Sequence, residues 1–126
     1  MLNNSAPENE ISYAVRGAAF KVNQELGPGL LESVYEAALT QELRNKGLSV
    51  VTQVGVPMVY KDTKMEIGFR LDILVNDSVI VEVKSVEILN DVHKKTLLTY
   101  LRLTEKKLGL LINFNSVSLK IQLLEL

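Results

Sequence analysis

The chain has 126 residues, of which 47% are hydrophobic and 23% are charged, and its formal net charge is −1. This balance is typical of one globular domain with a hydrophobic core. The absence of cysteine excludes disulfides, thiolate metal sites and cysteine nucleophiles. The single histidine, His93, excludes a site built from several imidazoles of one chain, and near-neutrality excludes a protein that coats nucleic acid by bulk charge.

The sequence predicts neither a signal peptide nor a membrane segment. Residues 1–10 have no basic start and no apolar run, and no stretch approaches the roughly 18 apolar residues of a membrane span. We therefore expect no membrane partner and a cytoplasmic location, with which the lack of cysteine agrees. We expect a single domain over residues 1–126, with residues 1–5 as a flexible tail.

Apolar spacing predicts two helices at the start of the chain. Ser5 and Glu8 have the spacing of a capping box, which places the first helix start at Ala6. The Gly-Pro-Gly segment at 27–29 ends this helix, because glycine suits a left-handed cap and proline cannot continue a helix. A second helix follows over about 30–46.

The period then changes from helical to extended. Valine-rich segments predict four strands, over 48–54, 56–60, 66–75 and 79–87. Asn90 or Asp91 caps a third helix that runs to about Glu105, and strands over 108–114 and 117–124 follow. The order α-α-β-β-β-β-α-β-β predicts an α/β fold, with helices packed around one mixed β-sheet.

Charged residues interrupt the most apolar predicted strand. Glu82 and Lys84 stand among the β-branched residues of 79–84, and because they are two residues apart they point to the same face. One interpretation is a half-exposed strand whose charged face is solvated. The other is that the charges are buried and have a partner or a function, because an unpaired buried charge is costly.

Asp72 on the preceding strand favours the second interpretation. If the hairpin loop is residues 76–78, Asp72 falls opposite Glu82 on one face, whereas a two-residue loop puts it on the other face. Two adjacent carboxylates repel each other unless a positive group lies between them, and either Lys84 or a divalent cation would serve. The pattern predicts a Mg²⁺ site for phosphodiester hydrolysis, in which Lys84 orients water or stabilises charge on the phosphate.

Two motifs carry a family resemblance. The segment at 29–35, Gly-Leu-Leu-Glu-Ser-Val-Tyr, resembles the name motif of the GxxExxY protein family, and so do its flanking Leu-Gly-Pro at 26–28 and the Leu-Ile-Asn-Phe at 111–114. Asp72, followed ten positions later by Glu82-Val83-Lys84, resembles the PD-(D/E)XK nuclease superfamily. The similarity spans roughly residues 15–124.

The resemblance implies a restriction-endonuclease-like fold and a set of site residues. It assigns metal binding to Glu32, Asp72 and Glu82, with Mg²⁺ or Mn²⁺ as the cofactor. It assigns catalysis to Lys84 together with Glu82 and Asp72. Glu36, one helical turn after Glu32, could replace it on physical grounds, although a solvated surface residue is the interpretation that we favour.

The third predicted helix supplies candidate substrate-binding residues. His93 and Tyr100 match the family pattern, whereas Thr96 stands where the family tends to have a longer glutamine. These three residues recur at helical spacing, and with Arg70 they are our candidates for substrate contact. His93 is also interpreted as a partly exposed helix residue. The nearby cations form either a basic patch for phosphate or an ordinary solvated face: Lys94, Lys95, Arg102, Lys106 and Lys107.

We therefore predict a metal-dependent nuclease that hydrolyses phosphodiester bonds by metal-activated water. Nucleic acid is the expected partner, and a homodimer would let two sites cut two strands. The alternative is a catalytically degenerate nuclease-fold module that binds nucleic acid or protein, which Thr96 and the near-neutral charge favour. A third possibility is a small-molecule phosphoester hydrolase, but no feature of the sequence favours it.

Overall fold

A computed structural model of the chain describes residues 7–126. These residues form three helices and five strands: α1 (Glu8–Leu26), α2 (Glu32–Asn45), β1 (Val50–Tyr60), β2 (Thr63–Val75), β3 (Val79–Lys84), α3 (Asp91–Thr104), β4 (Leu108–Asn113) and β5 (Lys120–Glu125). The predicted tail, the Ser5 capping box and the helix start at Ala6 lie outside the described residues. None of the described helices is long and apolar enough to cross a membrane.

Three predicted strand limits are wrong. The strands expected over 48–54 and 56–60 are one strand, β1, because Gly55 pairs with Arg70 and the edge position accommodates Pro57 beside a register shift. The strand expected to reach Glu87 ends at Lys84. The next two backbone amides, of Ser85 and Val86, donate to side chains instead of to a neighbouring strand. The last strand begins at Lys120 instead of Val117. The element order is therefore α-α-β-β-β-α-β-β.

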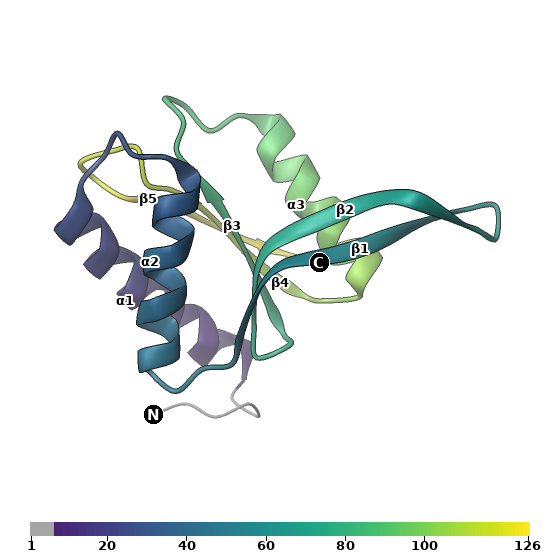
Figure 1. Ribbon diagram of the computed structural model, residues 1–126, viewed down its shortest axis with the longest axis horizontal. Helices are drawn as coiled ribbons and strands as arrows, with labels where there is room; N and C mark the ends of the chain where they lie inside the picture. The colour runs from purple at the N-terminus through teal and green to yellow at the C-terminus, as the bar shows by residue number, and fades with distance from the viewer. Residues whose placement is uncertain (1–6) are drawn as a thin grey trace.

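The five strands form one mixed sheet in the order β1-β2-β3-β4-β5. Only β3 and β4 are parallel, and α3 makes the crossover that a parallel pair requires. The helices α1 and α2 lie on one face of the sheet and α3 lies on the other (Figure 1). Each face buries its own hydrophobic cluster. The predicted mixed α/β architecture is confirmed.

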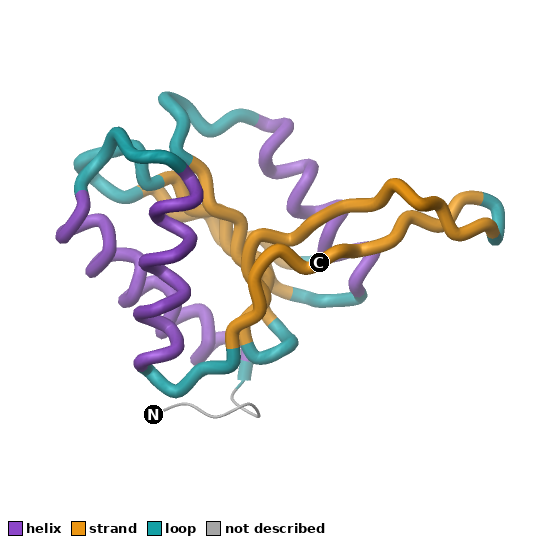
Figure 2. Tube along the Cα trace, in the orientation of Figure 1, coloured by secondary structure: helices purple, strands orange, loops and turns teal. Residues whose placement is uncertain are grey.

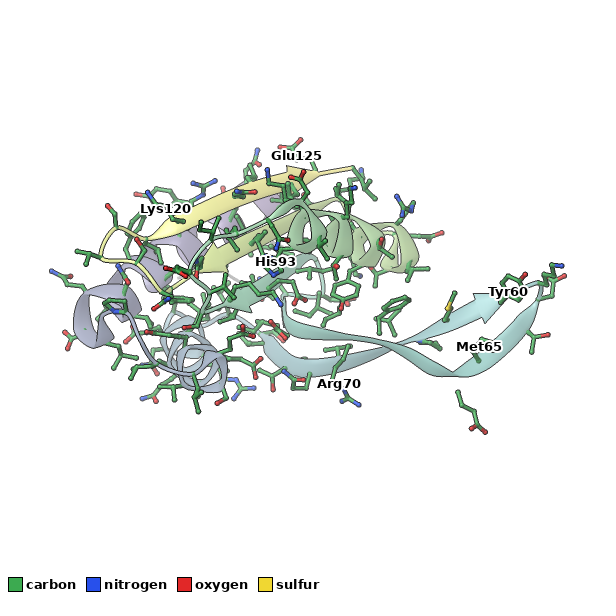
Figure 3. The ribbon with its side chains drawn as sticks, turned by 90° about the horizontal axis from the view of Figure 1, so that it is seen from above. Tyr60, Met65, Arg70, His93, Lys120 and Glu125 are labelled. Atoms are coloured by element: carbon green, nitrogen blue, oxygen red, sulfur yellow. The ribbon has the colours of Figure 1, made fainter. Side chains whose placement is uncertain are left out.

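The strands β1 and β2 continue beyond the sheet as a two-stranded arm, residues 56–69 (Figures 1 and 2). Lys61 and Asp62 turn the chain at its tip with left-handed φ angles of 48° and 64°. At the base the two strands come very close, because a Cβ on Gly68 would lie 2.3 Å from the Val56 carbonyl oxygen. Tyr60 and Met65 lie toward the far end of the arm (Figure 3).

The Gly-x-x-Glu-x-x-Tyr segment forms a clamp at the start of α2. The buried Tyr35 ring stacks on Phe114, with centroids 4.7 Å apart and planes 8° apart. Its hydroxyl donates to the Gly27 carbonyl at 2.5 Å and accepts from the Leu30 amide at 3.1 Å. Gly29 adopts a φ of 97°, which favours glycine. The motif thus fixes the loop that delivers Glu32, and Tyr35 is a core residue.

We expect Tyr35→Phe to lower the free energy of unfolding by about 1–3 kcal/mol, because it removes one hydroxyl that serves two backbone groups while keeping the ring stack. Urea denaturation measures this loss. Tyr60→Phe is the matched control, since that side chain is exposed on the arm, and it should leave stability unchanged. Equal stability of the two variants would contradict the clamp.

Candidate active site

The β2–β3 hairpin has the register that places the two strand carboxylates together. Val75 pairs with Val79 across the three-residue loop 76–78, and the last backbone pair of this ladder is Ile73 with Val81. Asp72 and Glu82 are the next residues on the two strands. The hairpin register predicted from the three-residue loop is confirmed.

The two carboxylates replace the next rung of the ladder. The Asp72 amide donates to Glu82 Oε1 at 3.2 Å, and the Val83 amide donates to Asp72 Oδ2 at 2.9 Å. Each side chain therefore satisfies a backbone N–H of the opposite strand, which would otherwise lack its partner. Beyond this point β2 separates from β3 and follows β1 into the arm (Figure 1).

Burial and repulsion change the protonation of Glu82. Glu82 is only 5% exposed, and its pKa is raised to about 9, first by burial, then by the charge of Asp72 and by a hydrogen bond between the two carboxyl groups. Lys84 lowers this pKa by a smaller amount. At neutral pH, Glu82 therefore holds a proton unless another positive charge takes its place.

Lys84 and Tyr100 approach the pair from the α3 side of the sheet. Ile80 packs in the α3 cluster while Val79, Val81 and Val83 pack in the other, so alternation places Glu82 and Lys84 on the α3 side. The pKa of Tyr100 is raised by burial and then by the charges of Glu82 and Asp72. Its ring contacts Phe69 edge-on, with the centroids 5.7 Å apart.

Glu32 reaches the end of β3 from the N-terminus of α2. Its Oε2 atom accepts from the Ser85 amide at 3.4 Å, and the Ser85 hydroxyl donates to the Leu30 carbonyl at 2.6 Å. The first turn of α2 and the residue after Lys84 are thereby joined. Glu32 therefore lies beside the site, with its carboxylate engaged by backbone.

Glu36 is a site residue that the sequence did not favour. It is half-buried, and Gln53 Nε2 donates to its Oε1 at 2.7 Å. Its pKa is raised by burial and by the charges of Asp72 and Glu32, whereas the Gln53 hydrogen bond lowers it. Glu36 is thus not the solvated surface residue that we expected. Its position one turn after Glu32 was a usable signal, but nothing in the sequence pointed to Gln53.

Asn113 is a second residue that the sequence did not single out for the site. It is buried and lies in register with Lys84 on the adjacent strand. Its Oδ1 accepts from the Val86 amide at 3.1 Å and its Nδ2 donates to the Val86 carbonyl at 2.9 Å. Asn113 therefore fixes the backbone just after Lys84. A buried asparagine ending an apolar strand was the available signal.

The four candidate substrate-binding residues differ in their surroundings. His93 Nδ1 accepts from the Asn90 amide at 3.2 Å and completes the cap of α3. Thr96 is exposed on α3. Arg70 is exposed on β2, donates to the Gln53 carbonyl at 3.3 Å and extends from the strand (Figure 3). Of the four candidates, Tyr100 has the most direct electrostatic contact with the acid pair.

The donor set fits a divalent cation through two carboxylates. In residues 7–126, no group of three or more acidic or imidazole side chains is close enough to hold a metal ion, so Glu32 does not join Asp72 and Glu82 in one group. Asp72 and Glu82 alone crowd enough negative charge to retain a proton, and a cation can replace that proton. Mg²⁺ suits such a site, because it uses few carboxylates and keeps several waters.

A family model described as the PD-(D/E)XK nuclease superfamily matches residues 9–124. The chain belongs to this superfamily. The match agrees with the mixed sheet flanked by helices, and it confirms the restriction-endonuclease-like α/β fold. No curated protein and no solved structure matches the sequence significantly.

The protonated acid pair of this superfamily member predicts a pH dependence. Without divalent cations, stability should fall as the pH rises from about 4.5 to about 9, because the folded chain retains a Glu82 proton that the unfolded chain releases. Melting temperatures in chelator across this range measure the slope.

Glu82→Gln should flatten this dependence, since its amide keeps no titratable proton. Glu25→Gln, at an exposed position on α1, is the matched control and should keep the wild-type slope. An unchanged slope in Glu82→Gln would show that another group causes the pH dependence.

Proposed function

We propose that the protein is a metal-dependent nuclease that hydrolyses phosphodiester bonds by metal-activated water, and that it belongs to the GxxExxY branch of its superfamily. The observation that carries this proposal is the pair formed by half-buried Asp72 and buried Glu82, with Lys84 on the same side of the sheet. Superfamily membership supports it independently. Nucleic acid is the proposed partner.

Asp72 and Glu82 would hold Mg²⁺ or Mn²⁺. When bound, such a cation lowers the pKa of a coordinated water and neutralises charge on a phosphate oxygen. The Lys84 ammonium group, on the same side as Glu82, stabilises the negative charge that develops on the phosphate. Glu36 and Glu32 add negative potential from α2, and the Tyr100 hydroxyl on the α3 side offers a hydrogen bond to phosphate or water.

The path of the nucleic acid follows from the cations around the pair. Arg70 is exposed on β2 two residues before Asp72, and it lines a pocket of about 470 Å³ along the arm together with Lys64, which lies near the arm tip. Lys95 is exposed on α3. Phosphates bound by these groups would cross the acid pair between the arm and α3. Thr96 is too short to add a glutamine-like contact.

One observation favours the degenerate-module alternative. Within the described part of the chain, no third acidic side chain completes the metal group. A two-carboxylate site binds a cation more weakly than a three-carboxylate site does. A measurement of metal binding therefore distinguishes the nuclease from the degenerate module, and it needs no knowledge of the substrate.

We expect Asp72→Ala to abolish Mn²⁺ binding measured by calorimetry, because it removes half of the donor pair. Lys84→Met should retain this binding, because the site keeps both carboxylates, but it should lower nuclease turnover by about 10²-fold or more. Turnover is measured on single- and double-stranded DNA and RNA with Mg²⁺, Mn²⁺ or chelator. Cleavage that survives chelator, or wild-type turnover in Lys84→Met, would refute the mechanism.

We expect Glu36→Gln to weaken Mn²⁺ binding more than Glu32→Gln. The charge of Glu36 acts directly on Asp72, whereas the Glu32 carboxylate is engaged by the Ser85 amide. The expected loss for Glu36→Gln is roughly tenfold, the scale of an outer partner of a metal ligand. Calorimetry on both variants checks the order, and a larger loss in Glu32→Gln would instead support the ligand set implied by the family resemblance.

A further inference from the structure

The outward face of α1 carries an unusual pair of exposed aromatic side chains. Tyr13 is 81% exposed and Phe20 is 54% exposed. With Asn9, Gly17 and Gln24 they recur at intervals of three and four residues, so they form one stripe, opposite the buried residues of the helix. This outer stripe (residues 9, 13, 17, 20 and 24) borders a groove of about 930 Å³.

Gly17 at the middle of the stripe has no role inside the folded chain. Glycine in a helix interior lowers helix stability relative to alanine. A Cβ added at Gly17 would meet only Lys46 Nζ, at an ordinary contact distance of 3.9 Å. The monomer therefore tolerates a side chain there. A glycine between two exposed aromatic residues instead suits the close approach of another backbone.

We propose that the outer stripe is the interface of a two-fold symmetric homodimer, in which α1 packs antiparallel against α1 of a second copy. Tyr13 lies four residues before Gly17, and Phe20 lies three residues after it. An antiparallel pairing centred near Gly17 places each Tyr13 against the Phe20 of the other copy and glycine beside the axis. Such self-complementarity is what a two-fold interface requires.

The charges beside the outer stripe are complementary to those of a second copy of this chain. Glu10 and Lys21 lie on the same flank, at helical spacing from Gly17. Two-fold antiparallel pairing brings Glu10 of each copy toward Lys21 of the other, so the ion pair forms twice. Lys21 is 62% exposed and pairs with Glu42 of α2 at 3.4 Å, so in the dimer its ammonium group would be shared between Glu42 and Glu10 of the second copy. Arg16, on the other flank, extends to solvent.

The proposed interface leaves the acid site open. The helix α1 lies on the face of the sheet opposite α3, and its outer side faces away from the arm (Figures 1 and 2). Both copies would therefore keep their arms and acid pairs accessible. The homodimer is independent of the proposed nuclease activity, and it can be tested without substrate or metal.

Sedimentation velocity on the full chain, from about 1 µM to about 200 µM, tests the proposal across the range in which a modest interface dissociates. We expect a reversible monomer–dimer equilibrium. Gly17→Gln should raise the dissociation constant by roughly tenfold or more, because its side chain holds the helices apart. The same substitution should raise the melting temperature of the dilute monomer, because it removes a helix glycine. If Gly17 served only the fold of the monomer, Gly17→Gln would instead lower the melting temperature.

Two further variants identify the face. Tyr13→Ser should weaken the dimer, whereas Tyr60→Ser, at an exposed tyrosine on the arm, should leave it unchanged. Glu10→Lys and Lys21→Glu should each weaken the dimer, and the double variant should restore it. A chain that stays monomeric at every concentration would overturn the proposal. A dimer that tolerates Gly17→Gln and Tyr13→Ser, or that is lost in Tyr60→Ser, would also overturn it.

Discussion

The arrangement of this protein depends on two carboxylates that meet where two strands separate. Asp72 and Glu82 close the last rung of the β2–β3 hairpin with their side chains, each accepting from a backbone amide of the other strand. Because the side chains satisfy these amides, β2 can leave β3 at this rung without orphaned donors. The opening of the sheet, the base of the arm and the candidate site are therefore one structural feature.

The rest of the chain holds three segments around the end of β3. Tyr35 fixes the loop before α2. The hydroxyl of Ser85, the residue after Lys84, donates to a carbonyl of that loop. From the other side, the buried amide of Asn113 holds Val86. These contacts are hydrogen bonds between short side chains and backbone, so they fix the backbone directly after Lys84. The GxxExxY motif therefore has mainly a structural role, because it positions its own glutamate, Glu32, beside the site.

The structural features that depend on residues close together in the sequence were predicted correctly. A three-residue loop fixes the β2–β3 register, and Asn90 caps α3 as its residue type predicts. The joining of two predicted strands into β1 was missed, because Gly55 separates the two valine-rich segments in the sequence but pairs with Arg70 in the sheet. The Glu36–Gln53 contact was missed because Gln53 adopts a left-handed φ of 52°, which only the neighbouring strand determines.

The burial of the acid pair also bears on whether the site is functional. Two carboxylates that lie side by side repel each other, and burial makes the charged form of Glu82 still less favourable. Lys84 offsets the charge of Glu82 only partly, because burial and Asp72 both raise its pKa more strongly. The two acids thus satisfy backbone amides at this rung while crowding their negative charge, and a bound cation would relieve that crowding.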